Sequence, residues 1–183
     1  VVPQPNWQDD LRDFRKLGVP RLFFGVNSGA MDSMVNHYTA AKRLRSNDAY
    51  TPGGQAGHRP DYAVTVYTRI LKRLYPDVPV VIGGIEASLR RLTHYDYWAD
   101  RLFPSVLVDS GADLLIYGMG ERPVVAAARA IAAGEDLRDI PQTAFFSDGP
   151  CPAAGEGTIV LHGYERVCRD KDAFIEDFNV EER

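Results

Sequence analysis

The chain has 183 residues, of which 45% are hydrophobic, 25 acidic and 21 basic, and its net charge at pH 7 is -4. This composition is typical of a globular domain and excludes a disordered chain, a collagen-like rod and a disulfide-stapled miniprotein. Because no apolar run approaches the roughly 18 residues of a membrane span and no secretion signal opens the chain, we expect a cytoplasmic protein with no membrane partner.

The first half of the chain alternates between helical and extended patterns. Apolar residues at helical spacing predict a helix over residues 7–17, and a short apolar run predicts a buried strand over 21–26. A polar stretch over 28–57 follows. The strongest apolar stripe of the sequence then predicts an amphipathic helix over 60–74, and a second buried strand is expected over 78–82.

The same alternation continues through the second half. The further expected elements are a helix over 87–92, a strand over 113–117, a helix over 121–133, and strands over 143–146 and 158–161. Strands without polar alternation, joined by helices, predict βαβ units whose sheet is covered on both faces.

These elements predict an α/β fold that is doubly wound, with a mainly parallel sheet and helices on both faces, as in Rossmann-like and flavodoxin-like proteins. We expect one domain over residues 1–165, and over 166–183 a terminal helix or a connector. Because the chain opens on Val1 rather than on a methionine, we also expect it to be part of a longer protein.

Three of the expected strands end in glycine-containing turns, at residues 25–29, 83–88 and 118–121. Ligands of open parallel sheets bind beyond the carboxyl ends of the strands, and glycine lets a phosphate or a cofactor approach the main-chain N–H groups there. The alternative is that short turns simply favour glycine. Neither the dinucleotide fingerprint nor a P-loop is present.

Two further segments are richer in polar and aromatic residues than a loop requires. An insertion of about thirty residues spans the polar strings between 31 and 54, and compact domains seldom carry such loops without a function. Residues 94–98 (HYDYW) have the chemistry to stack a flat ligand or to hold a proton donor; the alternative is that these aromatics anchor the core or an interface. The spacing of the four histidines supports no metal site.

Basic runs at residues 42–45, 72–73 and 90–91 have the charge to contact the phosphates of RNA. The alternative is that these runs are solvated faces of helices. The net negative charge disfavours nonspecific binding of nucleic acid by the domain as a whole.

The two cysteines, Cys151 and Cys168, are too far apart in sequence for a Cys-x-x-Cys redox pair and do not have the spacing of a zinc ribbon. Two thiolates cannot by themselves hold a four-cysteine iron–sulfur cluster.

Five strings of the sequence closely resemble the N-terminal region of the YgiQ-type family of radical SAM proteins. They are residues 32–40 (DSMVNHYTA), 45–54 (RSNDAYTPGG), 83–91 (GGIEASLRR), 94–98 (HYDYW) and 117–121 (YGMGE). The resemblance is ordered along the chain from about residue 7 to about residue 141, and these strings are more specific than any of the general motifs above.

The resemblance implies a cobalamin-binding-like Rossmann domain whose partner is a radical SAM barrel in the same polypeptide. In the family, the barrel carries Cys-x3-Cys-x2-Cys, which binds a [4Fe–4S] cluster and S-adenosylmethionine. Those cysteines have no counterpart here, so the resemblance implies an accessory domain without catalytic residues or metal ligands, and without its first βα unit. The string Asp-x-His-x-x-Gly, which would supply a histidine to cobalamin, is also absent.

In this reading the strand-end groove shapes the site of an unknown substrate. Its expected border consists of Ser28, Asp32, Gly83, Gly84, Glu86, Ser88, Gly118, Gly120 and Glu121. The residues expected to recognise polar groups of the substrate are Asp32, Glu86, Arg90 and Arg91, with His94 and Tyr95 packed nearby. The alternative function is that of a non-catalytic Rossmann-like module that binds a nucleotide or a structured RNA.

Overall fold

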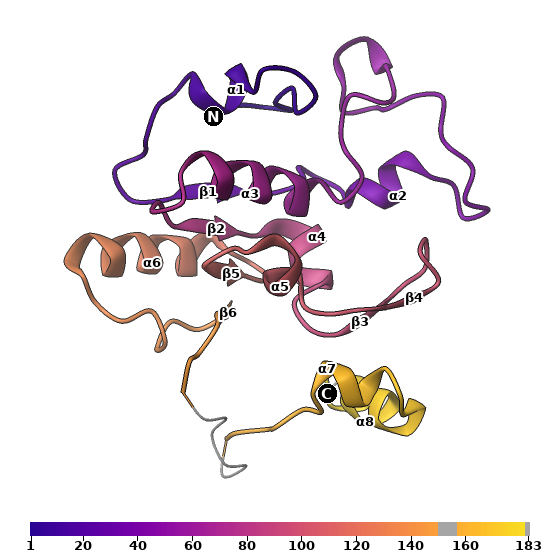
Figure 1. Ribbon diagram of the computed structural model, residues 1–183, viewed down its shortest axis with the longest axis vertical. Helices are drawn as coiled ribbons and strands as arrows, with labels where there is room; N and C mark the ends of the chain where they lie inside the picture. The colour runs from indigo at the N-terminus through magenta and orange to yellow at the C-terminus, as the bar shows by residue number, and fades with distance from the viewer. Residues whose placement is uncertain (150–156, 182–183) are drawn as a thin grey trace. The chain divides into compact units, whose positions relative to one another are not determined.

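The computed structural model describes residues 1–149 and 157–181 (Figure 1). The chain divides into two compact units. The first unit comprises residues 1–92 and 105–146, and the second comprises residues 93–104 together with the described part of 147–183.

A four-stranded sheet forms the centre of the first unit. Its strands lie in the order β1 (Phe24–Val26), β2 (Val80–Ile82), β5 (Leu114–Ile116) and β6 (Thr143–Ala144). The first three strands are parallel and in chain order, whereas β6 runs antiparallel to β5. The mainly parallel sheet predicted from the unbroken apolar strands is confirmed.

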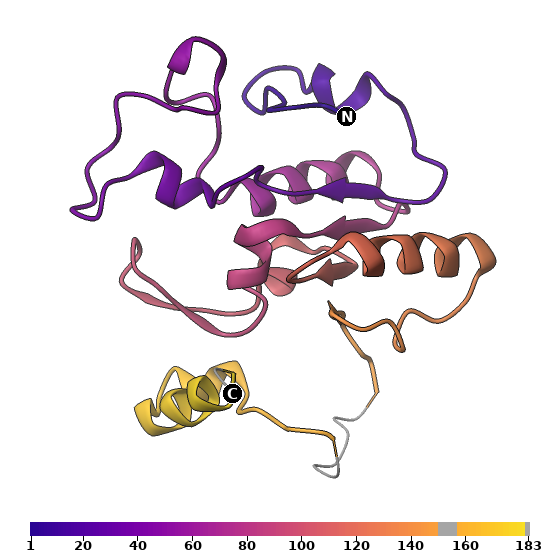
Figure 2. The ribbon, with the colours of Figure 1, turned by 180° about the vertical axis from the view of Figure 1, so that it is seen from behind.

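Helices lie on both faces of this sheet (Figures 1 and 2). The helices α3 (Ala63–Leu74) and α5 (Val106–Ser110) share one core with the sheet, and α6 (Glu121–Ala133) contributes to a second core. Alternate residues of the strands supply the two cores, because successive side chains of a strand point to opposite faces. The first core takes Val80, Ile82 and Leu115, and the second takes Val81, Leu114 and Ile116.

Each of these strand residues is at most 5% exposed, and burying a side chain of this size contributes roughly 1.5–3 kcal/mol. A strand that packs against helices on both sides needs apolar residues at every position, which is why no polar alternation marks these strands in the sequence. The doubly wound α/β fold predicted from the sequence is thereby confirmed.

The first helix is much shorter than predicted: α1 covers only Arg12–Arg15, whereas the apolar spacing predicted a helix over 7–17. The carboxylates of Asp9 and Asp10 accept hydrogen bonds from the main-chain N–H groups two residues ahead, at 2.9 and 3.0 Å. Such local turns compete with helix formation, and they leave Leu11 with a φ of +59° before the helix begins.

Two other predicted elements also differ from the structure. The helix predicted over 87–92 is α4 (Gly84–Leu89), which begins directly at the end of β2. Residues 159–161 form no strand, and the side chains of Ile159 and Val160 are 69% and 45% exposed. Of the strand predicted over 158–161, only Thr158 takes part in a β-bridge, and the exposed Ile159 and Val160 have no core to cover them among the described residues.

The polar insertion predicted between β1 and α3 is present, and we call residues 27–62 the inserted segment. It contains α2 (Ser33–His37) and a 3-10 turn, η1 (Pro52–Gly54). Two isolated antiparallel bridges connect different parts of the segment: one joins Tyr38 to Leu44, and the other joins Asn47 to Gln55. The segment is thus ordered by its own contacts rather than being a bare loop.

The second unit contains a hairpin and two helices. Its elements are β3 (His94–Asp96), β4 (Arg101–Phe103), α7 (Tyr164–Val167) and α8 (Lys171–Glu181). The strands β3 and β4 pair antiparallel, and the Tyr164 hydroxyl donates to the main-chain carbonyl of Leu102 at 3.2 Å. The single domain predicted over residues 1–165 stays a prediction. Across the part of the chain that is described, no helix is both long and apolar enough to cross a membrane.

Candidate functional site

The glycines at the strand ends allow the three parallel strands to approach one another closely. A Cβ atom on Gly83 would lie 3.1 Å from the carbonyl oxygen of Ile116. Gly84 has a φ of +80°, and a Cβ atom there would lie 3.2 Å from Cβ of Asn27. Gly118 also has a positive φ, of +67°. Packing alone therefore accounts for glycine at these turns, and the ligand groove predicted from them stays a prediction.

Glu86, on α4, is a buried carboxylate that joins the inserted segment to the end of β2. Its side chain is 1% exposed. One oxygen accepts the main-chain N–H of Ser33 at 2.8 Å and the other accepts that of Val64, also at 2.8 Å. These N–H groups belong to the first turns of α2 and α3, where helices leave their N–H groups unpaired. The negative charge also suits the positive ends of two helices.

Asp32 and Arg90 form a second buried polar group at the same place. One carboxylate oxygen of Asp32 caps α2 by accepting the N–H groups of Met34 and Val35, at 2.9 and 3.2 Å, and the other pairs with the guanidinium of Arg90. The guanidinium also lies 5.7 Å from the ring centre of Tyr62. These contacts explain why a charged pair is tolerated with side chains only 4% and 11% exposed.

The remaining predicted site residues occupy several positions. The Ser88 hydroxyl donates to the carbonyl of Gly84 at 2.8 Å and accepts the N–H of Gly118 at 3.2 Å, so it connects the turns after β2 and β5. A guanidinium nitrogen of Arg91 donates to the Ser88 carbonyl at 2.9 Å. Gly120 is the N-cap of α6, Glu121 is exposed in its first turn, and His94 and Tyr95 lie on β3 in the second unit.

The inserted segment surrounds a cavity of about 320 Å³. Its polar lining comes from α2, from the loop after it and from the turn before α3, and Trp7 closes one side. The residues of the lining that carry polar groups into it include Asn36, His37, Asp48, Arg59 and Asp61. This is a pocket of the size that small ligands occupy.

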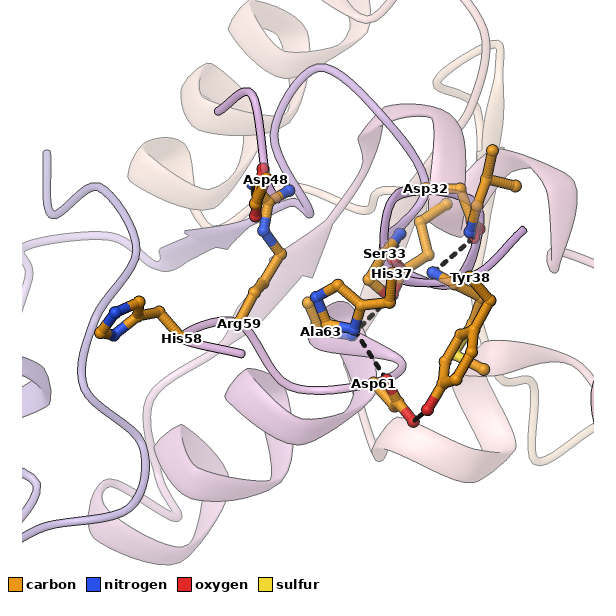
Figure 3. Close-up of polar contacts among 12 residues, drawn as sticks. Asp32, Ser33, His37, Tyr38, Asp48, His58, Arg59, Asp61 and Ala63 are labelled. Atoms are coloured by element: carbon orange, nitrogen blue, oxygen red, sulfur yellow. Dashed lines mark hydrogen bonds and ion pairs between the residues drawn. The ribbon is translucent and has the colours of Figure 1, made fainter. Parts of the chain in front are cut away.

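A histidine, an aspartate and a tyrosine form a chain of hydrogen bonds at this cavity (Figure 3). Nδ1 of His37 lies 2.7 Å from one carboxylate oxygen of Asp61, and the Tyr38 hydroxyl donates to the other at 2.8 Å. The hydrogen bond to Asp61 raises the pKa of the Tyr38 hydroxyl above its usual value. His37 is only 7% exposed, and its Nε2 has no hydrogen-bond partner among the described residues.

A buried ion pair holds the opposite side of the inserted segment. Arg59 donates to the main-chain carbonyl of Ser28 at 2.9 Å and pairs with Asp48 at 3.3 Å. Burial acts to raise the pKa of Asp48, but the hydrogen bond from the Tyr50 N–H, the neighbouring polar side chains of Asn36 and Thr51 and the charge of Arg59 outweigh it, so the pKa lies below its usual range. The predicted groove residue Ser28 is thereby tied to the cavity.

The cavity residues were not predicted as site residues. The polar density of residues 31–54 did indicate that the insertion has a role, and it includes His37 and Asp48. Asp61 and Arg59, however, lie at the end of the inserted segment, beyond the polar strings. The folding of the segment brings Asp61 to His37 and Arg59 to Asp48, and no spacing in the sequence predicts these pairs.

The described residues do not provide a metal centre. Within residues 1–149 and 157–181, no three His, Cys, Asp or Glu side chains are grouped so as to hold a metal ion. Cys168 is an exposed free thiol, and Cys151 lies outside the described residues. The three thiolates that the resemblance requires for a [4Fe–4S] cluster exceed the two cysteines of the whole chain, so its residues do not fit that cluster.

Comparison with known proteins places these features in a family. The chain is 60% identical to a UPF0313 protein of Porphyromonas gingivalis over 97% of its own length and 29% of the relative's. It is 55% identical to a UPF0313 protein of Bacteroides thetaiotaomicron, covering 32% of that protein, and 52% identical to one of Geobacter sulfurreducens, covering 30%. No solved structure matches the chain.

The chain therefore spans about a third of the length of these relatives, and in each of them it corresponds to one part of a larger polypeptide. The family model described as radical SAM N-terminal matches residues 1–183. The chain belongs to the radical SAM N-terminal family.

Proposed function

We propose that this chain is the N-terminal accessory domain of a radical SAM enzyme that acts on an unidentified substrate. The observation that carries the proposal is the family match over all 183 residues, combined with relatives about three times as long. The [4Fe–4S] cluster and S-adenosylmethionine would be held by the remaining two-thirds of the polypeptide, since the cysteines of this chain do not suffice. Cobalamin is not part of the proposal, because its histidine motif is absent.

The surface at the carboxyl ends of β2 and β5 suits contact with the rest of such a polypeptide. Large apolar side chains are exposed there: Ile85 by 50%, Leu89 by 59% and Met119 by 74%. Apolar side chains gathered on a surface favour an interaction site. In the proposed enzyme this face packs against the catalytic barrel, and Glu121 and Gly120 beside it border the substrate site.

The enzymatic part of this proposal is tested on the full-length protein. Anaerobic reconstitution with iron and sulfide is expected to give the absorbance of a [4Fe–4S] cluster. Addition of a strong reductant and S-adenosylmethionine is then expected to yield methionine and 5′-deoxyadenosine. A protein that binds no cluster and does not cleave S-adenosylmethionine would contradict the proposal.

The interdomain contact is tested separately by an Ile85→Asp substitution in the same full-length protein. A carboxylate placed in an apolar interface must lose its hydration, so we expect the accessory domain to detach and the polypeptide to be cut faster by protease. Val108→Asp is the matched control, because Val108 is 55% exposed on α5. Equal cleavage of the two variants would show that the face around Ile85 is not an interface.

A further inference from the structure

The cavity in the inserted segment carries two opposite charges that a ligand can reach. Arg45 is exposed, and the side chain of Asp61 is 42% exposed. Both residues belong to the described part of the chain and line the cavity, and they form no ion pair with each other. Neither charge is therefore neutralised by the other, and each can be met by a group of the ligand.

The guanidinium of Arg45 is held at one edge and open at the other. Its Nε donates to the Tyr38 carbonyl at 3.1 Å, and the main-chain N–H of Arg45 donates to the His37 carbonyl at 2.7 Å. Its two terminal amino groups make no hydrogen bond or ion pair with any residue that the structure describes. Such a pair of N–H groups matches the two oxygens of a carboxylate. Asn47, which is also exposed and lines the cavity, has an amide nitrogen that can donate as well.

The carboxylate of Asp61 has hydrogen-bonding positions left for a ligand. Nδ1 of His37 lies 2.7 Å from one of its oxygens, and the Tyr38 hydroxyl donates to the other at 2.8 Å (Figure 3). An ionised carboxylate has about four acceptor positions, so about two remain, and the exposure of the side chain lets a ligand reach them. The two contacts also fix the orientation of the carboxylate. Asp61 therefore presents a positioned negative charge to a cationic group.

The remaining polar side chains of the lining are buried. Arg59 and Asp48 are paired with each other at 3.3 Å, and their side chains are only 7% and 3% exposed. Nδ2 of Asn36 and Nε2 of His37 have almost no accessible surface, so no molecule in the cavity reaches them. Recognition of a ligand thus depends on the exposed groups described above.

The presence of both charges determines the kind of ligand. An anion would pair with Arg45 but would be repelled by Asp61, and a cation would meet the reverse situation. An α-amino acid carries a carboxylate and an ammonium group on one carbon atom and therefore complements both side chains. Such a ligand brings no net charge to the cavity.

The rest of the lining is largely apolar and consists of Trp7, Leu44, Ala56, Gly57 and Pro60. We propose that this cavity binds a free α-amino acid with an apolar side chain. Its carboxylate pairs with Arg45 and accepts from Asn47, its ammonium group pairs with Asp61, and its side chain packs against the apolar lining. The volume of about 320 Å³ is at the small end for ligand pockets, as a molecule of this size requires. The proposal does not depend on the enzymatic function proposed above.

Three probes that share one branched apolar body separate the two charges. L-leucine carries both, 4-methylpentanoate has the carboxylate without the ammonium group, and 3-methylbutylamine has the ammonium group without the carboxylate. We expect calorimetry on the full-length protein to give saturable binding of L-leucine. Each of the other two probes is expected to bind about tenfold more weakly or less, because it lacks one charge-assisted contact.

Variants that each remove one charge provide the matched test. Arg45→Met keeps a long side chain, and we expect it to weaken L-leucine binding about tenfold without weakening that of 3-methylbutylamine. Asp61→Asn keeps the shape of the side chain, and we expect it to weaken L-leucine binding about tenfold without weakening that of 4-methylpentanoate. Arg43→Met is the control, because Arg43 is exposed in the same segment but does not line the cavity. This variant is expected to bind all three probes as the unmodified protein does.

Several results would overturn the proposal. They are equal affinity for the three probes, tighter binding of either singly charged probe than of L-leucine, equal effects of Arg45→Met and Arg43→Met, and absence of L-leucine binding. If Asp61→Asn does not fold, the comparison of the three probes on the unmodified protein and on Arg45→Met decides.

Discussion

The strand ends of the sheet and the cavity of the inserted segment both bury polar side chains, but they differ in whether those groups are satisfied. At the strand ends both oxygens of Glu86 accept main-chain N–H groups, and Asp32 is paired with Arg90 while it caps α2. In the cavity, Nε2 of His37 has no partner among the described residues. The two regions lie at opposite ends of α2, which begins at Ser33 beside Glu86 and ends at His37.

The comparison separates two roles that look alike in a sequence. A buried charge whose hydrogen-bonding positions are filled by the protein holds the structure together, and a ligand could reach it only by breaking those bonds. A buried polar atom without a partner contributes no such bond and instead costs stability. The recognition of substrate by Glu86 and Asp32 stays a prediction, and their contacts show that both residues also position the inserted segment.

The largest expected effect is on the strand-end group. Glu86→Ala would leave the N–H groups of Ser33 and Val64 without acceptors and would open a cavity under α2 and α3. We expect the free energy of unfolding to fall by about 3–5 kcal/mol, measured by urea denaturation. The same variant is expected to loosen the inserted segment, seen as faster hydrogen exchange in residues 33–37.

Glu121→Ala is the control for this change, because Glu121 is exposed and stands only in the first turn of α6. Its loss is expected to cost less than about 1 kcal/mol, the value of a carboxylate near a helix N-terminus. Similar losses for the two variants would mean that the contacts of Glu86 do not set it apart from a surface carboxylate.

The second-largest loss of stability is expected when the ion pair of Asp48 and Arg59 in the inserted segment is broken. Asp48→Asn leaves Arg59 buried without a counter-charge, and we expect a loss of about 3 kcal/mol at pH 7. The pKa of Asp48 is lowered in the fold from 3.8, so its contribution is fully present above that pH and is lost as the pH falls through the folded-state pKa. In urea unfolding, the free energy of unfolding of the variant should therefore fall less between neutral and acid pH than that of the unmodified protein. An equal fall in the two proteins would contradict this account.

A smaller effect is expected from the close approach of the strand ends. Gly84→Ala puts a Cβ atom 3.2 Å from Cβ of Asn27 at a φ of +80°, and we expect a loss of about 2–3 kcal/mol in thermal or urea unfolding. In Gly111→Ala the φ is +74° but no atom lies within 4 Å, so only the backbone cost of about 1 kcal/mol is expected. Equal losses would show that Asn27 moves aside freely.

The fold was largely predictable from the sequence because its central strands are short, apolar on every residue and separated by helices. Val80, Val81 and Ile82 are each at most 5% exposed, as a strand covered on both sides requires. The first helix was mispredicted because the apolar spacing of residues 7–17 ignores Asp9 and Asp10, whose side chains compete for the main-chain N–H groups.

The site was less predictable, because the hydrogen-bond partners of its polar side chains come from distant parts of the chain. His37 and Asp61 are 24 residues apart, and Glu86 lies 53 residues from Ser33. The sequence shows that these residues are polar and that they lie near strand ends or in a long insertion. Whether a polar atom ends with a partner or without one depends on how the loop closes, and this distinguishes Glu86 from His37.

The smallest effect expected is that of Tyr38→Phe, which removes the hydrogen bond from the Tyr38 hydroxyl to Asp61. The side chain of Asp61 is 42% exposed, so water replaces part of the lost bond, and we expect a loss of about 0.5–1 kcal/mol at pH 7. The hydrogen bond to Asp61 raises the pKa of Tyr38 above 10.0, so its contribution is present below pH 10.0 and is lost as the pH rises through the folded-state value. Between pH 8 and pH 11 the free energy of unfolding should therefore change less with pH in the variant than in the unmodified protein. An equal loss of stability in both proteins would show that Tyr38 does not support Asp61. His37 would then be held by Asp61 alone.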